Sequence, residues 1–498
     1  MTYSPTRLLG EKRFSSEDTI RFAALSGDRN PMHVDPVFAR RTQFGRQVVH
    51  GMHTLLWGLD QFFAGVGAPR PTSLKVRFAK PAFIGDTVQL RVADSVENER
   101  RLEITASDVA LVTLSLVFGG KSAVFGGSSG VPDLQISDGH APSQSPRELG
   151  LADINGMVGS ISLAVGTVEA GGSFPAATRA LGGGVVSALV ATSRVVGMEC
   201  PGMHSIFAGL SVDFVEPSRP TASLRWRVTR VDTRIRRVDL EISGGGIVGR
   251  LDTFLRMPPT RQLAMSEICK AVDSDELAGE CALIIGGSRG LGEVTAKIIA
   301  AGGGVPVITY AVGREEAVEL AAEISGAGRK CHIMPYDVRS SAAQQLAALP
   351  AEPTAFYYFA TCSIFRRKLA FYEPALMREF TAFFVDGFYD LCSELHARRK
   401  GKLAGFYPST VAIDSQPREL TEYCLAKLAG EALCASLRSC LPDLDIVVAR
   451  LPRIQTDQTA TVVPVRSEPP LDIMLPIVRK VRAAATAPQK QEPVSASG

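Results

Sequence analysis

The sequence lacks the features of exported proteins, of membrane-spanning proteins and of proteins with structural metal sites. No cysteine precedes Cys200, and no two of the nine stand at a C-x-x-C spacing, so we expect neither a disulfide framework nor a bound metal. The chain has no apolar run long enough to cross a membrane, and it begins without the apolar segment of a signal peptide. We therefore expect a cytoplasmic protein with no membrane partner.

A large excess of charge of one sign is also missing. The chain carries 54 Lys and Arg against 51 Asp and Glu, a net charge of +3, and the basic residues are scattered. Proteins that bind nucleic acid by neutralising phosphates need a basic stripe, so no nucleic-acid partner is expected. An anionic ligand must be held by a local site.

What is present is a chain of 498 residues, too long for one hydrophobic core. A stretch rich in Gly, Ser and Pro and, later, the pair Pro258-Pro259 divide it. We predict a first domain at residues 1–120 and a second domain at 151–258, joined by a linker at 121–150. A third domain follows at 279–465, and residues 483–498 form a flexible tail.

The first two domains share a pattern of helix, strand with F-x-x-P, and alternating strand, which predicts an internal duplication. The helical runs are 50–63 and 182–196, the phenylalanines are Phe78 and Phe214, and the alternating strands are 87–92 and 223–228. The third domain alternates short apolar strands with helical runs, which indicates a parallel sheet covered by helices.

An acid and an imidazole lie five residues apart in the string Ser26-Gly-Asp28-Arg-Asn30-Pro-Met-His33. A carboxylate and a neutral histidine that share a water can take its proton and return it to a carbanion, as hydration beside a carbonyl requires. Shortly afterwards His50-Gly51 opens a helical run, and a backbone N–H at a helix start is a natural oxyanion donor. Residue types alone also allow a turn-capping Asp28 and a surface His33.

The whole string resembles the signature of the MaoC-like (R)-specific enoyl-CoA hydratases, which have the hot dog fold. The resemblance spans residues of about 10 to 120, including the F-x-x-P-x-x-x-G-D stretch that ends at Asp86. It implies that Asp28 and His33 activate water and that Gly51 supplies the oxyanion N–H. The second domain has no such signature, so it resembles at most the degenerate half of a double hot dog that lends a wall to the acyl tunnel.

A second constellation begins with an apolar strand at residues 281–285 and a glycine turn that opens a helix, the arrangement that places a pyrophosphate at a helix N-terminus. The next strand ends without an acidic residue for a free ribose hydroxyl, whereas Arg289 and Arg314 suit a 2′-phosphate. NADP is therefore favoured over NAD. The predicted turn residues are Gly286, Ser288, Arg289, Gly290, Leu291 and Gly292.

Downstream, Tyr423 and Lys427 stand four residues apart on one helix face, where a nearby cation favours the phenolate. Alone, such a pair is usually surface decoration. With the glycine turn and Pro408-Ser409-Thr410 it resembles the short-chain dehydrogenase/reductase family, a Rossmann fold. The resemblance makes Tyr423 the acid/base and Lys427 the ribose binder, with either Ser409 or Thr410 polarising a carbonyl. It adds Asp337, Val338, Ala360 and Thr456 as cofactor contacts.

This segment departs from the family pattern at several positions. The expected asparagine of the central helix is Phe384, the N-N-A-G motif reads Tyr358-Phe-Ala-Thr361, and the glycine after Pro452 is Arg453. These changes put a proton relay through the asparagine in doubt.

The expected fold is therefore multidomain, an α+β double hot dog followed by an α/β Rossmann doubly wound sheet. The leading hypothesis is a bifunctional enzyme on a coenzyme A or carrier-protein thioester, an (R)-type enoyl hydratase/dehydratase with an NADP-dependent 3-ketoacyl/3-hydroxyacyl oxidoreductase, acting as a homodimer. One alternative is a dehydratase whose reductase-like domain binds nucleotide but is catalytically weak. Another is a non-catalytic acyl-thioester scaffold.

Overall fold

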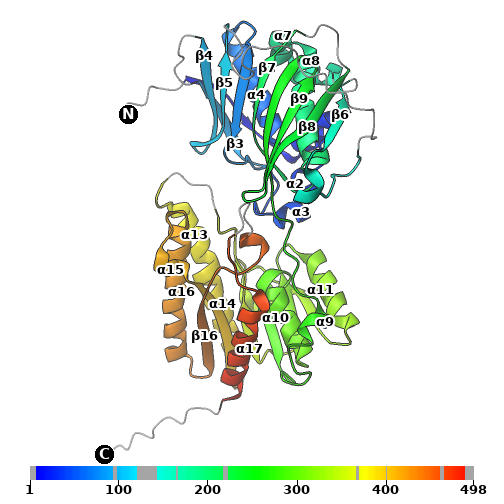
Figure 1. Ribbon diagram of the computed structural model, residues 1–498. Coiled ribbons are helices and arrows are strands. Elements are labelled where there is room, and N and C mark those ends of the chain that lie inside the picture. The colour runs from blue at the N-terminus through cyan, green and yellow to red at the C-terminus, as the bar shows by residue number, and fades with distance from the viewer. Residues whose placement is uncertain are drawn as a thin grey trace, which may run out of the picture. The chain divides into compact units, whose positions relative to one another are not determined.

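The computed structural model describes residues 7–92, 98–119, 143–163, 167–216, 222–365, 370–399, 401–459 and 465–487 (Figure 1). It divides into two compact units, residues 1–258 with 461–465, and residues 259–460 with 466–498. Most of the predicted linker, at 120–142, lies outside the described residues, as does the tail from 488.

The first unit is built on one antiparallel sheet of ten strands in the order β1-β3-β4-β5-β2-β7-β10-β9-β8-β6. The strands are β1 Arg7–Arg13, β2 Ser73–Phe78, β3 Thr87–Val92, β4 Glu99–Ala106, β5 Val109–Val117, β6 Val158–Ser162, β7 Ser205–Phe214, β8 Ser223–Asp232, β9 Arg237–Gly244 and β10 Ile247–Leu255. The second five strands repeat the order of the first five about the β2–β7 pair, in which Val76 faces Leu210. The internal duplication is therefore present, and the unit is a double hot dog.

The helices of this unit are α1 Ser16–Ser26, α2 Pro31–Val34, α3 Pro36–Arg40, α4 Gly51–Val66, α5 Leu151–Ile154, α6 Thr167–Ser173, α7 Pro175–Leu181, α8 Gly183–Arg194 and the π-helix η1 Val195–Glu199. The long helices α4 and α8 are apolar along most of their length and share one core with the sheet, as their runs of buried Leu, Val and Phe predict. In the part of the chain that the structure describes, no single helix is long and apolar enough to span a membrane; α7 together with α8 and η1 meets that test only as a bent pair.

Local sequence determines where the loop that carries Asp28 begins. Ser15 and Asp18 form a capping box at the start of α1, with Ser15 Oγ accepting from Asp18 N–H at 3.1 Å. The helix ends at Gly27, whose φ of 70° is left-handed and suits glycine. Asp28 is therefore the first residue after a rigid helix end, and Asn30 starts α2 by accepting from Met32 N–H at 3.1 Å.

The second unit has a parallel sheet of six strands in the order β13-β12-β11-β14-β15-β16. The strands are β11 Cys281–Ile285, β12 Val305–Tyr310, β13 His332–Pro335, β14 Ala355–Tyr358, β15 Leu403–Thr410 and β16 Leu444–Leu451. The order reverses between β11 and β14, which in a doubly wound sheet is the crevice where ligands bind. The predicted Rossmann sheet is confirmed.

Helices cover both faces of this sheet, with one core on each face. They are α9 Met265–Ile268, α10 Gly290–Ala301, α11 Arg314–Gly326, α12 Ala342–Leu346, α13 Pro374–Thr381, π-helix η2 Ala382–Asp386, α14 Gly387–Arg398, α15 Ala412–Ser415, η3 Arg418–Leu420, α16 Thr421–Cys440, η4 Asp457–Thr459 and α17 Pro470–Thr486. The sequence-based boundaries at 465 and 483 are wrong here, because α17 buries Met474, Ile477, Val478 and Val481 in the core and continues to Thr486.

Candidate functional site

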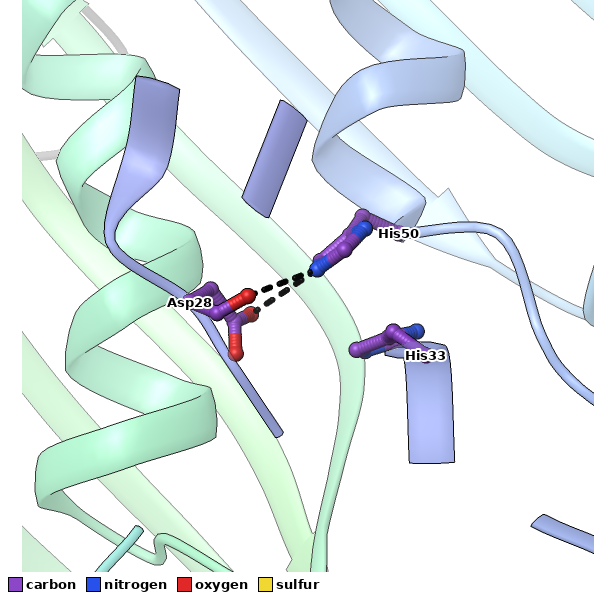
Figure 2. A group of neighbouring side chains, drawn as sticks. All are labelled: Asp28, His33 and His50. Atoms are coloured by element: carbon purple, nitrogen blue, oxygen red, sulfur yellow. Dashed lines mark hydrogen bonds and ion pairs between the residues drawn. The ribbon is translucent and has the colours of Figure 1, made fainter. Parts of the chain in front are cut away.

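Asp28, His33 and His50 meet inside the first unit, from three short neighbouring segments (Figure 2). Asp28 follows α1, His33 lies on α2, and His50 is the residue before α4. All three are buried, with exposed fractions of 2%, 8% and 0%. The sequence therefore placed the acid and the imidazole correctly in one site, but it assigned no role to His50.

Hydrogen bonds settle how the two rings are held. His33 Nδ1 lies 2.7 Å from the Val48 carbonyl oxygen, and His50 Nε2 lies 3.0 Å from the Asp28 carbonyl oxygen. A carbonyl only accepts, so these ring nitrogens carry the protons. The rings stack with centroids 3.8 Å apart. His33 is left with an unprotonated Nε2, which can accept a proton from water.

The electrostatics of the cluster favour a neutral imidazole, and the contacts of Asp28 offset part of the burial that disfavours its ionised form. Burial lowers the pKa of His33, although the nearby Asp28 opposes this, and burial lowers the pKa of His50 still further. Burial raises the pKa of Asp28, while His33, the Ser193 hydroxyl and the Asn30 N–H lower it. The three residues also have ligand atoms close enough for a metal, but the His50 nitrogen that faces Asp28, Nε2, donates to a carbonyl, so we assign acid/base chemistry to the cluster.

Gly51 is the first residue of α4, and its N–H therefore has no acceptor within the helix. A Cβ at this position would lie 3.2 Å from the Phe78 ring. The bare backbone at the positive end of a buried helix fits the predicted oxyanion donor.

The second half of the first unit reaches this cluster directly, which the sequence did not indicate. The Ser193 hydroxyl on α8 donates to Asp28 Oδ2 at 2.7 Å. Asn30 Nδ2 donates to the carbonyl oxygens of Gly197, Gly202 and Met203, at 3.0, 3.3 and 3.2 Å. The second half is therefore part of the site and more than a tunnel wall.

In the second unit the glycine turn has the form that a dinucleotide needs. Gly286 and Gly290 have φ of 75° and 58°, and a Cβ on Gly292 would lie 2.3 Å from the Gly286 oxygen. Gly286 N–H donates to Thr309 Oγ1 at 3.0 Å, which ties the turn to β12. Ser288, Arg289 and Leu291 complete the turn before and within the first residues of α10, where the helix dipole favours a phosphate.

Other predicted cofactor residues gather at the same edge of the sheet. A Cβ on Gly286 would lie 2.9 Å from the Ala360 nitrogen, and one on Gly290 would lie 3.8 Å from Thr456 Cγ2. Arg314 begins α11 just beyond β12, and Val338 is buried after β13. The carboxylate of Asp337, however, is held by the Arg339 guanidinium at 3.0 and 2.7 Å, so an adenine would have to compete with this pair.

Tyr423 and Lys427 lie on α16, and the structure decides between the two hydroxyls before them. The Thr410 side chain interacts with the Tyr423 phenol and lowers its pKa, against the larger effect of burial, whereas Ser409 donates to the Glu431 carboxylate. Successive residues of a strand point to opposite faces, which separates the two. The structure therefore favours Thr410 over Ser409 as the hydroxyl beside Tyr423.

Lys427 is held by the chain itself. Its Nζ donates to the Pro408 carbonyl oxygen at 2.6 Å and lies 4.0 Å from the centroid of the Phe384 ring. Burial lowers the pKa of Lys427 to about 7 and raises the pKa of Tyr423 to about 12. Phe384, which replaces the expected asparagine, thus packs its ring against the Lys427 ammonium group.

Comparison with known proteins identifies the first unit. A MaoC like domain model matches residues 5–113. The (R)-specific enoyl-CoA hydratase of Aeromonas caviae is 38% identical over 119 residues, covering 23% of this chain and 84% of that enzyme. The chain belongs to the MaoC-like hydratase family. The 3-hydroxybutyryl-CoA dehydratase of Methylorubrum extorquens is 35% identical over 103 residues, 20% of this chain and 64% of that protein, so the chain spans less than two thirds of this relative.

The second unit contains a short-chain dehydrogenase domain, whose family model matches residues 280–352. This match covers the glycine turn and stops before Tyr423 and Lys427. Among solved structures, a 3-oxoacyl (acyl-carrier-protein) reductase from Agrobacterium tumefaciens with NADP bound has 19% identity and a TM-score of 0.33, over 37% of this chain and 74% of that one. The chain is thus a fusion of a MaoC-like domain with a short-chain dehydrogenase domain, and both families are enzymes.

Proposed function

We propose that the chain is a bifunctional acyl-thioester enzyme. The MaoC-like unit interconverts a 2-enoyl thioester and an (R)-3-hydroxyacyl thioester, and the dehydrogenase unit interconverts 3-hydroxyacyl and 3-ketoacyl thioesters. The observation that carries the proposal is the geometry of His33, whose proton on Nδ1 is fixed by Val48 and whose Nε2 is left as a base beside Asp28.

The hydration step follows from this arrangement. His33 Nε2 and the Asp28 carboxylate bind one water; as His33 takes a proton, the water oxygen bonds to C3 of the enoyl group. Negative charge moves to the thioester oxygen, where the Gly51 N–H stabilises it. The proton that His33 took from the water is then returned to C2, so that one water has been added and His33 is neutral again; dehydration is the reverse.

For the second reaction, the residues present fit a nicotinamide dinucleotide through the glycine turn, and when bound this cofactor supplies or accepts the hydride at C3. The chain's own contribution is a proton: Tyr423, with the Thr410 side chain beside its phenol, exchanges it with the C3 oxygen. Arg289 and Arg314, with no acidic residue at the end of β12, support NADP over NAD.

A second candidate is a dehydratase whose dehydrogenase-like unit binds nucleotide but turns over weakly. The observation that favours it is Lys427, whose Nζ is taken by the Pro408 carbonyl and lies over Phe384. Such a lysine is less available to a ribose.

One experiment separates the two. The full chain is incubated with a short 2-enoyl-CoA and NADP, and in reverse with a 3-ketoacyl-CoA and NADPH, with products identified by mass spectrometry. The bifunctional proposal predicts hydroxyacyl and ketoacyl products, with ketone reduction lost in Tyr423→Phe. Hydroxyacyl product without any ketone reduction supports the second candidate, and unchanged reduction by Tyr423→Phe contradicts the role of the tyrosine.

The setting of the enzyme is part of the proposal. We propose a cytoplasmic homodimer that takes coenzyme A or carrier-protein thioesters. Exposed apolar side chains on α14 and α16 support self-association: Tyr389, Leu425 and Leu428 are 52%, 45% and 46% exposed. Light scattering that shows only monomer at micromolar concentration would contradict the dimer.

A further inference from the structure

The Ser193 hydroxyl has a hydrogen-bond partner that is unusual for a helical serine. Serine and threonine hydroxyls inside helices commonly bond a carbonyl one turn earlier, as Thr192 does with the Leu189 oxygen at 2.6 Å. Ser193, also in α8 and 4% exposed, instead donates to Asp28, 165 positions earlier in the chain. The bond therefore joins the half that lacks the signature to the acid of the half that has it.

The next turn after α8 also contacts the Asp28 carboxylate. Here α8 passes into the π-helix η1, a widened turn that occurs often at functional sites. A Cβ on Gly197 would lie 2.2 Å from Asp28 Oδ1, so the carboxylate rests against bare backbone. The pale green ribbon near Asp28 in Figure 2 belongs to this half of the unit.

The hydrogen bond from Ser193 affects the ionisation of Asp28. Asp28 is fully buried and faces His33 on α2, His50 before α4 and Arg194 on α8. Burial disfavours its ionised form, and the side-chain bond from Ser193 is among the contacts that favour it. Removing the hydroxyl leaves the buried carboxylate with one donor fewer.

We infer that Ser193 is a positioning residue for hydration, which fixes the direction and the ionised form of the Asp28 carboxylate from the second half of the double hot dog. The inference rests on the proposed hydratase function. Its consequence is that the half without the signature is required for chemistry, because it orients the acid. A first domain alone would hold the complete signature without this donor.

The test is the pH profile of hydration of crotonyl-CoA by the full chain. The Ser193→Ala variant removes one oxygen, and we expect its kcat/KM to fall by about 10- to 100-fold at the acid side, with the acid limb moved up by about one pH unit. The direction follows because loss of a donor to the carboxylate raises the pKa of Asp28, so the active ionised form is lost at a higher pH. KM changes less than kcat.

Ser187→Ala is the matched control. Ser187 also lies on α8, is also 4% exposed, and its hydroxyl has no hydrogen-bond partner among the described residues. It should keep the wild-type rate and profile. Ser193→Thr, which retains a hydroxyl, should recover at least part of the rate at low pH, with folding of each variant checked by circular dichroism.

An unshifted profile in a folded Ser193→Ala variant, or equal losses in both alanine variants, would overturn the inference while leaving the hydratase function in place. A wild-type chain without hydration activity, or an Asp28→Asn variant as active as wild type, would instead refute the proposed function itself. The two failures are thus distinguishable in one set of assays.

Discussion

Replacing Gly197 by alanine adds one methyl group against the Asp28 carboxylate and so tests whether the proposed acid/base chemistry depends on the position of that carboxylate. Gly197 lies in η1, and its φ is outside the left-handed region, so an alanine fits the backbone. The only obstacle is steric: the new Cβ would lie 2.2 Å from Asp28 Oδ1 and 2.6 Å from Asp28 Cγ. Contacts of real Cβ atoms are essentially never below 3.0 Å, so the oxygen must retreat by about 0.8 Å.

The size of the effect follows from that displacement. Moving a catalytic group by about 1 Å can cost on the order of 100-fold in rate, so we expect kcat for hydration to fall by that order. Overpacking costs about 1–3 kcal/mol of the free energy of unfolding, while alanine in place of glycine in a helix returns about 0.5–1 kcal/mol. Activity should thus fall far more than stability.

The assay compares hydration kinetics and urea unfolding of Gly197→Ala with those of Gly172→Ala. Gly172 lies in α6 of the same half, and a Cβ there would meet nothing within 4 Å. The control should retain full activity. A Gly197→Ala variant with wild-type kcat would show that Asp28 does not need its observed position, and the reasoning would fail.

Three further predictions concern the dehydrogenase unit. Glu280 is buried, which raises its pKa to about 7 in the folded state against an ordinary 4.5 in the unfolded chain, so its ionised form destabilises the fold above pH 7. Glu280→Gln should therefore raise the free energy of unfolding, measured with urea, by about 1–3 kcal/mol at pH 8 and by little at pH 4.5. Thr410→Ala should lower ketone reduction by about 10-fold or more and Ser409→Ala should not, because Thr410 interacts with Tyr423 whereas Ser409 is held by Glu431; equal losses would contradict the assignment. Since the folded pKa of Lys427 is about 7 against an unfolded 10.5, stability should decrease as pH falls from 10.5 to 7, and Lys427→Met should remove that part of the slope in thermal unfolding.

Short-range signals in the sequence were enough to place much of the fold. The apolar run Cys281–Ile285 is a strand with the predicted bounds, because it is short, β-rich and followed by a glycine turn. Asp28 and His33 come together for a similar reason: both lie on a single loop whose shape is set by Gly27, Asn30 and their neighbours.

Other features depend on contacts that no local pattern contains. Ser193 sits in the string Ala-Thr-Ser-Arg, which carries no motif, and it reaches Asp28 only because β2 pairs with β7 and brings the two halves together. Thr410 and Ser409 are both hydroxyls in one strand, and only the direction of each side chain decides which one meets Tyr423. By contrast, the helix to Thr486 was readable from its apolar spacing at positions 474, 477, 478 and 481.

The central claim is that Asp28 and His33 activate water for addition to an enoyl thioester. The most direct measurement is the rate of crotonyl-CoA hydration by the purified full chain and by its Asp28→Asn and His33→Gln variants, at a pH where all remain folded. The account predicts hydration by the wild type and a loss of at least about 100-fold in each variant. Wild-type hydration that survives either substitution would contradict it.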